Sequence, residues 1–172
     1  MVLKDPAKKV SPARFLAVNG LLGALALVLS ALEMMLPAMP FLPPGAKLGL
    51  SNLATMYAVG STGLLPALCI ALIKGLFAGM MRGMTAMLMS LAGGFLSTLV
   101  MWAVFRCRQL GMMGVGILGA LAHNAAQLFT AFLLTSAAVF WYAPILVLFS
   151  LISGTLTGIL LRVIMPVLHK IL

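Results

Sequence analysis

Long apolar runs make up most of this chain and constrain its fold more than any other feature. Short breaks rich in proline, glycine or basic residues separate them. A helix needs roughly 20 mostly apolar residues to cross the hydrocarbon layer of a bilayer. The sequence therefore predicts an all-α, polytopic membrane bundle of six transmembrane helices. The predicted spans are Phe15–Leu36, Leu48–Gly60, Leu64–Met81, Met84–Phe105, Met112–Phe140 and Ala143–Leu168.

The composition excludes a water-soluble globule. The chain is 63% hydrophobic and 8% charged, and its mean hydropathy is +1.21. A soluble domain carries roughly a quarter of its residues as Asp, Glu, Lys and Arg, because its surface must face water. The net charge of +9 does not indicate nucleic acid, since the cations lie in the N-terminal segment and at the ends of apolar runs. We expect the apolar surface to face lipid.

The placement of the cations predicts the topology. With six spans, eight cations share the side of the N-terminus, whereas Lys47 and Arg82 lie on the opposite side. The eight are Lys4, Lys8, Lys9, Arg14, Arg106, Arg108, Arg162 and Lys170. Because cytoplasmic segments are rich in Lys and Arg, we expect both termini to be cytoplasmic, in a bacterial cell membrane. The second span has about 12 residues, short for a crossing, but omitting it would place Arg106 and Arg108 outside.

One domain accounts for the whole chain in this interpretation. Residues 1–13 are expected to form a cytoplasmic tail, and residues 14–172 a single six-helix transmembrane domain. The sequence contains no convincing internal repeat. An inverted-repeat transporter is therefore not supported.

Three cations and one acid are predicted to meet in the outer half of the bundle. Lys74 lies inside the third span, Arg82 ends that span, and Lys47 precedes the second span. An ionisable group in a membrane costs roughly 2.5–3.5 kcal/mol on insertion scales, so each needs a reason. Either Glu33 pairs with Lys47 or Lys74 while Arg82 reaches the lipid headgroups, or the excess of cations forms an outward-facing cavity that attracts anions.

A second polar group lies in the middle of the fifth span. His123 and Gln127 share a helix face, as do Asn124 and Gln127. Asn52 is a similar amide in the second span. Polar groups inside a membrane need partners in the bundle or in a wet cavity. The pattern fits a hydrogen-bonded clasp between helices, a ligand contact or a proton relay, but the ligand spacing for a metal site is missing.

Small residues recur at every third or fourth position of the first helix, at Ala13, Ala17, Gly20 and Ala24. Such stripes let helices approach closely in lipid. This stripe either packs within the bundle or docks a partner subunit. Glycines repeat similarly on the third and sixth helices, at Gly75, Gly79, Gly83, Gly154 and Gly158.

No catalytic constellation is found in the sequence. Its acids are Asp5, in the tail, and Glu33. There is no carboxylate pair, no phosphate-binding loop and no triad. We therefore expect a protein that is not an enzyme, needs no cofactor and cannot hydrolyse ATP. A homo-oligomeric channel is disfavoured, because most helices lack polar groups in their inner halves.

Three segments resemble the Gx transporter family, which is also labelled heptaprenyl diphosphate synthase component I. They are PGAKLGLSN at residues 44–52, ALIKG at 71–75 and GALAHNAAQ at 119–127. The resemblance implies a membrane protein similar to the S components of energy-coupling-factor transporters. In those systems the S component captures a vitamin-like molecule, and a membrane coupling subunit with two ATPases drives its uptake. The resemblance also implies that the loop Pro37–Ala46 gates the site and that the small-residue stripe contacts the coupling subunit.

The sequence thus leads to two expectations of function. The first is an S-component-like subunit that captures a small anionic or amphipathic vitamin or cofactor precursor. The second is a non-catalytic accessory subunit for prenyl or quinone synthesis or for an electron-transfer assembly. The residues expected to line the cavity are Glu33, Lys47, Asn52, Lys74, Arg82, His123, Asn124 and Gln127.

Overall fold

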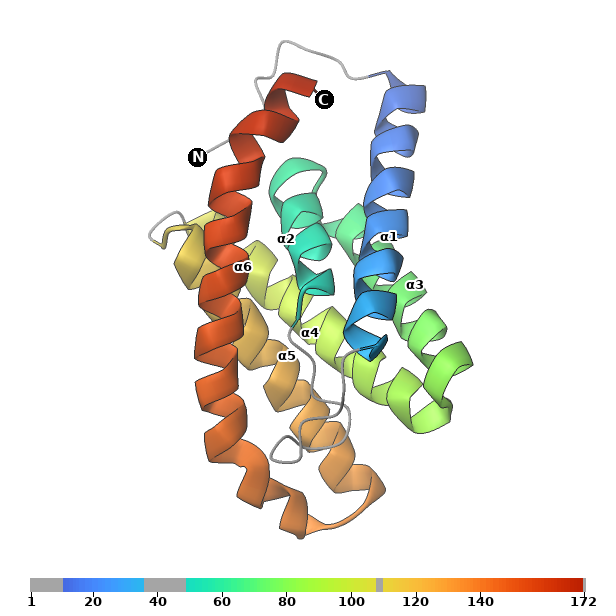
Figure 1. The fold of residues 1–172 in the computed structure, drawn as a ribbon, viewed down its shortest axis with the longest axis vertical. Helices are drawn as coiled ribbons and strands as arrows, with labels where there is room; N and C mark the ends of the chain where they lie inside the picture. Colours follow the sequence, from blue (N-terminus) through green and yellow to red (C-terminus); the bar gives the residue numbers. More distant parts are fainter. Residues whose placement is uncertain (1–10, 36–48, 108–109, 172) are drawn as a thin grey trace.

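The structure, a computed structural model, describes residues 11–35, 49–107 and 110–171. This part of the chain forms six α-helices and one 3-10 helix, and it holds no strand. They are α1 (Pro12–Met35), α2 (Ser51–Ser61), α3 (Leu64–Arg82), α4 (Met84–Cys107), α5 (Met112–Leu134), η1 (Ala137–Tyr142) and α6 (Ala143–Ile171). In Figure 1, α1 begins and α6 ends at the same end of an elongated bundle, here called the terminal end. The predicted all-α architecture is confirmed.

Five helical segments of the described chain are long and apolar enough to cross a membrane, which makes the chain a multi-pass membrane protein. They are α1, α3, α4, α5 and the segment Ala137–Pro166. The exception is α2, whose 11 residues reach about 16 Å at about 1.5 Å per residue, half of the roughly 30 Å core. The second predicted span is therefore a helix, but a short one.

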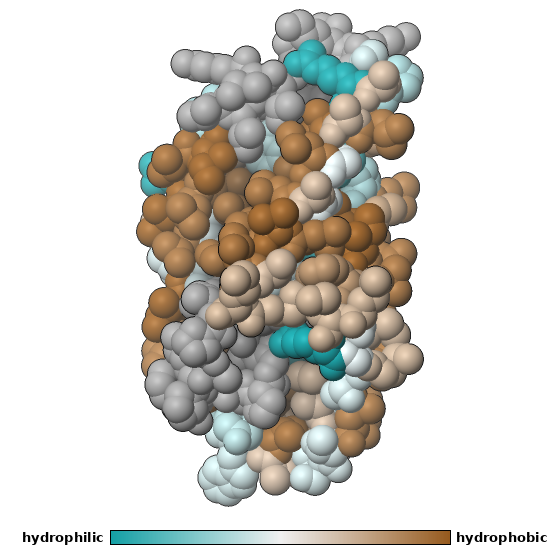
Figure 2. Space-filling view, turned by 45° about the vertical axis from the view of Figure 1, so that its right-hand side comes forward, coloured by the Kyte–Doolittle hydropathy of each residue, from teal (hydrophilic) through white to brown (hydrophobic). Residues whose placement is uncertain are grey.

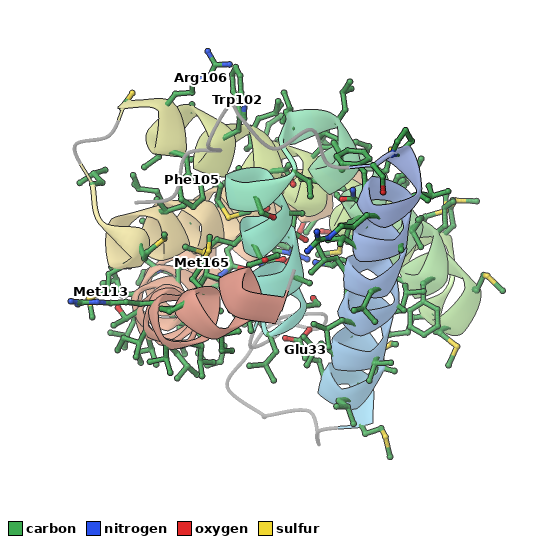
Figure 3. The ribbon with its side chains drawn as sticks, turned by 90° about the horizontal axis from the view of Figure 1, so that it is seen from above. Glu33, Trp102, Phe105, Arg106, Met113 and Met165 are labelled. Atoms are coloured by element: carbon green, nitrogen blue, oxygen red, sulfur yellow. The ribbon has the colours of Figure 1, made fainter. Side chains whose placement is uncertain are left out.

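The position of α2 explains why a short helix is tolerated. Figures 1 and 3 show α2 in the middle of the bundle, where it contacts α1, α3, α4 and α6. Most of its residues are buried, among them Met56, Tyr57 and Val59. A partial helix can lie at membrane depth when protein, rather than lipid, surrounds its backbone.

The outer surface carries the apolar side chains that the composition predicts. Figure 2 shows a broad brown, hydrophobic region across the middle of one face of the bundle. Leu16 of α1 and Leu65 and Met80 of α3 are strongly exposed examples. An apolar surface of this extent is explained by contact with lipid.

Glycines bring α5 close to α6, and α3 close to α4. A Cβ atom on Gly116 of α5 would lie 2.3 Å from the backbone oxygen of Gly154 on α6. A Cβ atom on Gly75 of α3 would lie 2.2 Å from Leu91 of α4. Both contacts admit no larger residue without a shift, so Gly75 and Gly154 serve packing, whereas Gly83 lies beyond the end of α3 with open space around it.

The fifth predicted span is too long at its C-terminal end. It was expected to reach Phe140, but α5 ends at Leu134 and a separate 3-10 helix follows. The backbone turns at Thr135 and Ser136, and Phe140 packs back on Phe132, with ring centroids 5.2 Å apart. The error arose because η1 is as apolar as the helices beside it. Its Trp141 is 88% exposed, as in the aromatic belt of a membrane interface.

Candidate functional site

The Glu33 carboxylate from α1 holds the beginning of α2. Leu50, the residue before α2, makes no side-chain cap of its own. Instead, the Leu50 N–H and the Ser51 hydroxyl both donate hydrogen bonds to the Glu33 carboxylate. Figure 3 shows Glu33 near the α1 end that leads toward α2. The first N–H groups of a helix carry partial positive charge, so a carboxylate is stabilised there.

Lys74 from α3 binds the same turn of α2. Its ammonium group donates a 2.8 Å hydrogen bond to the side-chain oxygen of Asn52. Lys74 is 5% exposed and Glu33 is 7% exposed. One buried cation and one buried carboxylate thus converge on the first turn of α2, and their formal charges cancel. The predicted role of Glu33 as an organiser of cations is consistent with this arrangement and stays a prediction.

The polar group of the fifth predicted span connects α5 with α4 and α6. The Asn124 amide donates a 2.7 Å hydrogen bond to the Ser150 hydroxyl of α6, and Ser150 donates to the backbone oxygen of Leu146. The His123 ring lies against Gly93 of α4, where an added Cβ atom would come within 2.9 Å of it. Asn124 is therefore part of an interhelical clasp.

Two small adjoining cavities lie between α2, α5 and α6 and share Gly49, Asn52, Ala120 and Ser153. We call the first the polar chamber. In addition to the shared residues, Glu33, Ser51, His123 and Asn124 line it. We call the second the methionine chamber. In addition to the shared residues, Met56, Met101, Gly116, Gly119 and Thr157 line it. The site thus combines hydrogen-bonding groups in one chamber with thioethers and glycine backbone in the other.

Four of the residues expected to line a cavity do line the polar chamber, namely Glu33, Asn52, His123 and Asn124. Lys74 is buried behind Asn52, to which it is bound. The remaining three lie elsewhere or cannot be placed. Gln127 is buried on α5 but lines neither chamber. Arg82 is exposed at the end of α3, where it is attracted electrostatically by Glu33. Lys47 lies outside the described residues.

The small-residue stripe of α1 does not pack within the described bundle. Ala13, Ala17, Gly20 and Ala24 are all exposed, and a Cβ atom on Gly20 would meet nothing within 4 Å. The buried face of α1 is instead formed by Leu22, Gly23, Ala26, Ser30 and Glu33.

Sequence reasoning missed the contribution of α6 to the site. Ser150, Ser153 and Thr157 follow one helix face and are buried, and the latter two line the methionine chamber. The spacing of three and four residues between these hydroxyls was the available signal. It is weak, because serines and threonines in apolar helices usually bond to their own backbone.

A known structure shares this fold. The match covers 94% of this chain and 98% of the other, with a TM-score of 0.68 and 17% sequence identity, and that structure is described as the "Structure and mechanism of the S component of a bacterial ECF transporter". The chain therefore has the fold of an S component, and at this identity the likeness establishes the fold alone.

The family of the chain follows from its sequence. A family model described as "Heptaprenyl diphosphate synthase component I" matches residues 22–164. The chain belongs to this family, which is the Gx transporter family of the resemblance noted above. No functionally curated protein matches it.

Proposed function

We propose that this chain is the substrate-binding membrane subunit of a transporter of the energy-coupling-factor type. On this proposal it captures a small anionic or amphipathic vitamin or cofactor precursor, and partner ATPases drive uptake across a bacterial cell membrane. The observation that carries the proposal is the pair of chambers between α2, α5 and α6, within an S-component fold. Buried amide, hydroxyl and imidazole groups beside an apolar floor are typical of small-molecule sites.

The exposed small-residue stripe on α1 supports the proposal that the chain binds a partner subunit in the membrane. Ala13, Ala17, Gly20 and Ala24 present a face without large side chains, and the space above Gly20 is open. Small residues of this kind permit close helix contacts in lipid. We assign this face to the coupling subunit.

Affinity purification of the tagged chain from its native membranes tests the proposal. We expect a membrane coupling subunit and ATPase subunits to co-purify, and native mass spectrometry to detect a bound small molecule. That molecule, once isotopically labelled, should enter cells only when the ATPases are active. Uptake of the same molecule by the purified chain alone in liposomes would contradict the proposal.

The family description favours a second candidate function. A chain of this family is described as a component of heptaprenyl diphosphate synthase. With Asp5 and Glu33 as its acids, we propose that in this case the chain would assist a soluble synthase rather than catalyse. Stable co-purification with such a synthase, without any uptake, would favour this candidate over transport.

A further inference from the structure

One hydroxyl in the chambers lacks the partner that its neighbours on α6 have. Ser150, Thr155 and Thr157 each donate to the backbone oxygen four residues earlier, at 2.7, 2.6 and 3.0 Å. Ser153 makes no such bond, and within the described chain its hydroxyl has no hydrogen-bond partner. It is 6% exposed and lines both chambers. Because Ser153 lines the chambers, its hydroxyl is available to a ligand.

The opposite wall presents an oriented amide. Because Lys74 donates to the side-chain oxygen of Asn52, the NH2 group of Asn52 is turned away from Lys74. This nitrogen lies near Gly49, 3.5 Å from where a Cβ atom of Gly49 would stand, and Gly49 lines both chambers. Asn52 on α2 therefore offers a donor, while Ser153 on α6 can donate or accept.

The charges around this pair disfavour an anion. Among the described residues that line the two chambers, the charged side chain is the Glu33 carboxylate. Lys74, bound to Asn52, and Arg82, which attracts Glu33 from the end of α3, line neither chamber. A carboxylate or phosphate between Asn52 and Ser153 would add a second negative charge beside Glu33 in a site of low dielectric, which is unfavourable.

We propose that the captured molecule carries a neutral carbonyl or amide group, which Asn52 and Ser153 bind from opposite sides. A slender or flat apolar part of the same molecule fills the methionine chamber. There Met101 packs against Gly119 so closely that an added Cβ atom would lie 2.6 Å from it, and the flexible thioether of Met101 can move aside. This inference rests on the proposed function and narrows its substrate class from anionic or amphipathic to amphipathic with a neutral head.

Cysteine labelling tests the charge preference without knowledge of the ligand. Both native cysteines, Cys69 and Cys107, are exposed and are first replaced by alanine. Ser153→Cys is then introduced, with Ser136→Cys, exposed between α5 and η1, as the matched control. Each variant is treated with three methanethiosulfonates, namely the neutral methyl, the anionic sulfonatoethyl and the cationic trimethylammonioethyl reagent.

We expect the neutral reagent to modify position 153. The ratio of neutral to anionic rates should be at least about tenfold larger at 153 than at 136, because a buried site beside the Glu33 carboxylate disfavours an added negative charge. Equal ratios at the two positions would overturn the inference, as would failure of every reagent at 153 under conditions that fully label 136. Serine and cysteine are nearly isosteric, so we expect Ser153→Cys to fold normally. A melting temperature in detergent equal to that of the cysteine-free chain verifies that a lack of labelling is not caused by misfolding.

Native mass spectrometry of chain purified from its own membranes gives a second test. Ser153→Ala should lower the occupancy of the co-purifying molecule at least about tenfold, whereas Thr155→Ala, on the same helix but bonded to its own backbone, should not. Full occupancy in Ser153→Ala, or a bound molecule whose head is a carboxylate or phosphate, would overturn the inference. If the neutral reagent labels position 153 selectively but the chain never co-purifies with ATPases, the proposed transport function is refuted. The assignment of the chambers to a neutral ligand group is then retained.

Discussion

The ammonium group of Lys74 on α3 lies 2.8 Å from the side-chain oxygen of Asn52 on α2. This bond joins a residue buried in the third helix to the wall that the two chambers share. It also fixes which end of the Asn52 amide is presented to the cavity. Lys74 thus orients a neutral side chain of the chamber wall.

Replacing Lys74 by methionine should destabilise the protein and weaken ligand binding. The change removes the buried cation nearest the first turn of α2, beside Glu33, and frees the Asn52 amide to rotate. We expect a loss of about 3 kcal/mol in the free energy of unfolding, measured by denaturation in detergent. Arg162→Met, which removes an exposed cation of α6, is the control and should change little. Unchanged ligand occupancy in a folded Lys74→Met variant would contradict the assigned cavity.

The charges of Glu33 and Lys74 should be energetically coupled through the first turn of α2. Glu33→Gln keeps an oxygen that accepts the Leu50 N–H but removes the charge. We expect the double variant Glu33→Gln/Lys74→Met to be more stable than the sum of the single losses by about 0.5–3 kcal/mol. A double-mutant cycle of unfolding free energies measures this difference, and strict additivity would show that the two charges do not balance each other.

Adding a methyl group at Gly116 should separate α5 from α6. The new Cβ atom would lie 2.3 Å from the backbone oxygen of Gly154, so a backbone has to move. We expect Gly116→Ala to lower the unfolding free energy by about 1–3 kcal/mol. Gly20→Ala, where the space is open, is the matched control and should be neutral or slightly stabilising. Equal melting temperatures for the two variants would refute the close contact.

Bulk on the small-residue stripe of α1 should block partner docking without affecting the ligand. Gly20→Leu fills the open space of the stripe, and we expect at least about a tenfold loss of co-purifying coupling subunit, as close helix contacts are lost. Ligand occupancy should remain, because Gly20 is exposed on a face away from the chambers. Leu25→Phe, also exposed on α1, provides the control. Normal partner recovery with Gly20→Leu would remove α1 from the interface.

The proposed topology can be read from cysteines in intact cells. Cys107 ends α4 at the proposed cytoplasmic side, and Ser136 follows α5 at the opposite end of that helix. A membrane-impermeant maleimide should label Ser136→Cys in whole cells and should reach Cys107 only after lysis. Labelling in the reverse order would invert the orientation that the distribution of cations predicts.

The sequence predicted where four helices begin, because the breaks before them contain chemistry that stops a helix. α3, α4, α5 and α6 start at the predicted residues. Gly63 and Gly83, with φ of +104° and +87°, form tight connections that other residues adopt poorly. By contrast, the end of α5 carries no such residue, and its position depends on how Phe140 packs against Phe132.

The candidate site was predicted less completely, for a physical reason. Charges and amides in an apolar helix attract notice because they are expensive there, and this singled out Glu33, Lys74 and Asn124. A serine hydroxyl costs little free energy in such a helix, since most serines there bond to their own backbone. Ser150 bonds to its own helix backbone, whereas Ser153 does not. Nothing in the sequence distinguishes the two serines. That difference depends on how α6 is turned toward α2.

The carboxylate of Glu33 has a consequence for how the protein can be moved. It attaches α1, whose outward face is open to a partner, to the first turn of α2, which forms a wall of the cavity. A partner that tilts or shifts α1 would therefore displace that wall through two hydrogen bonds, with no need for the partner to reach the cavity. Glu33 therefore couples movement of a surface helix to movement of the interior of the bundle.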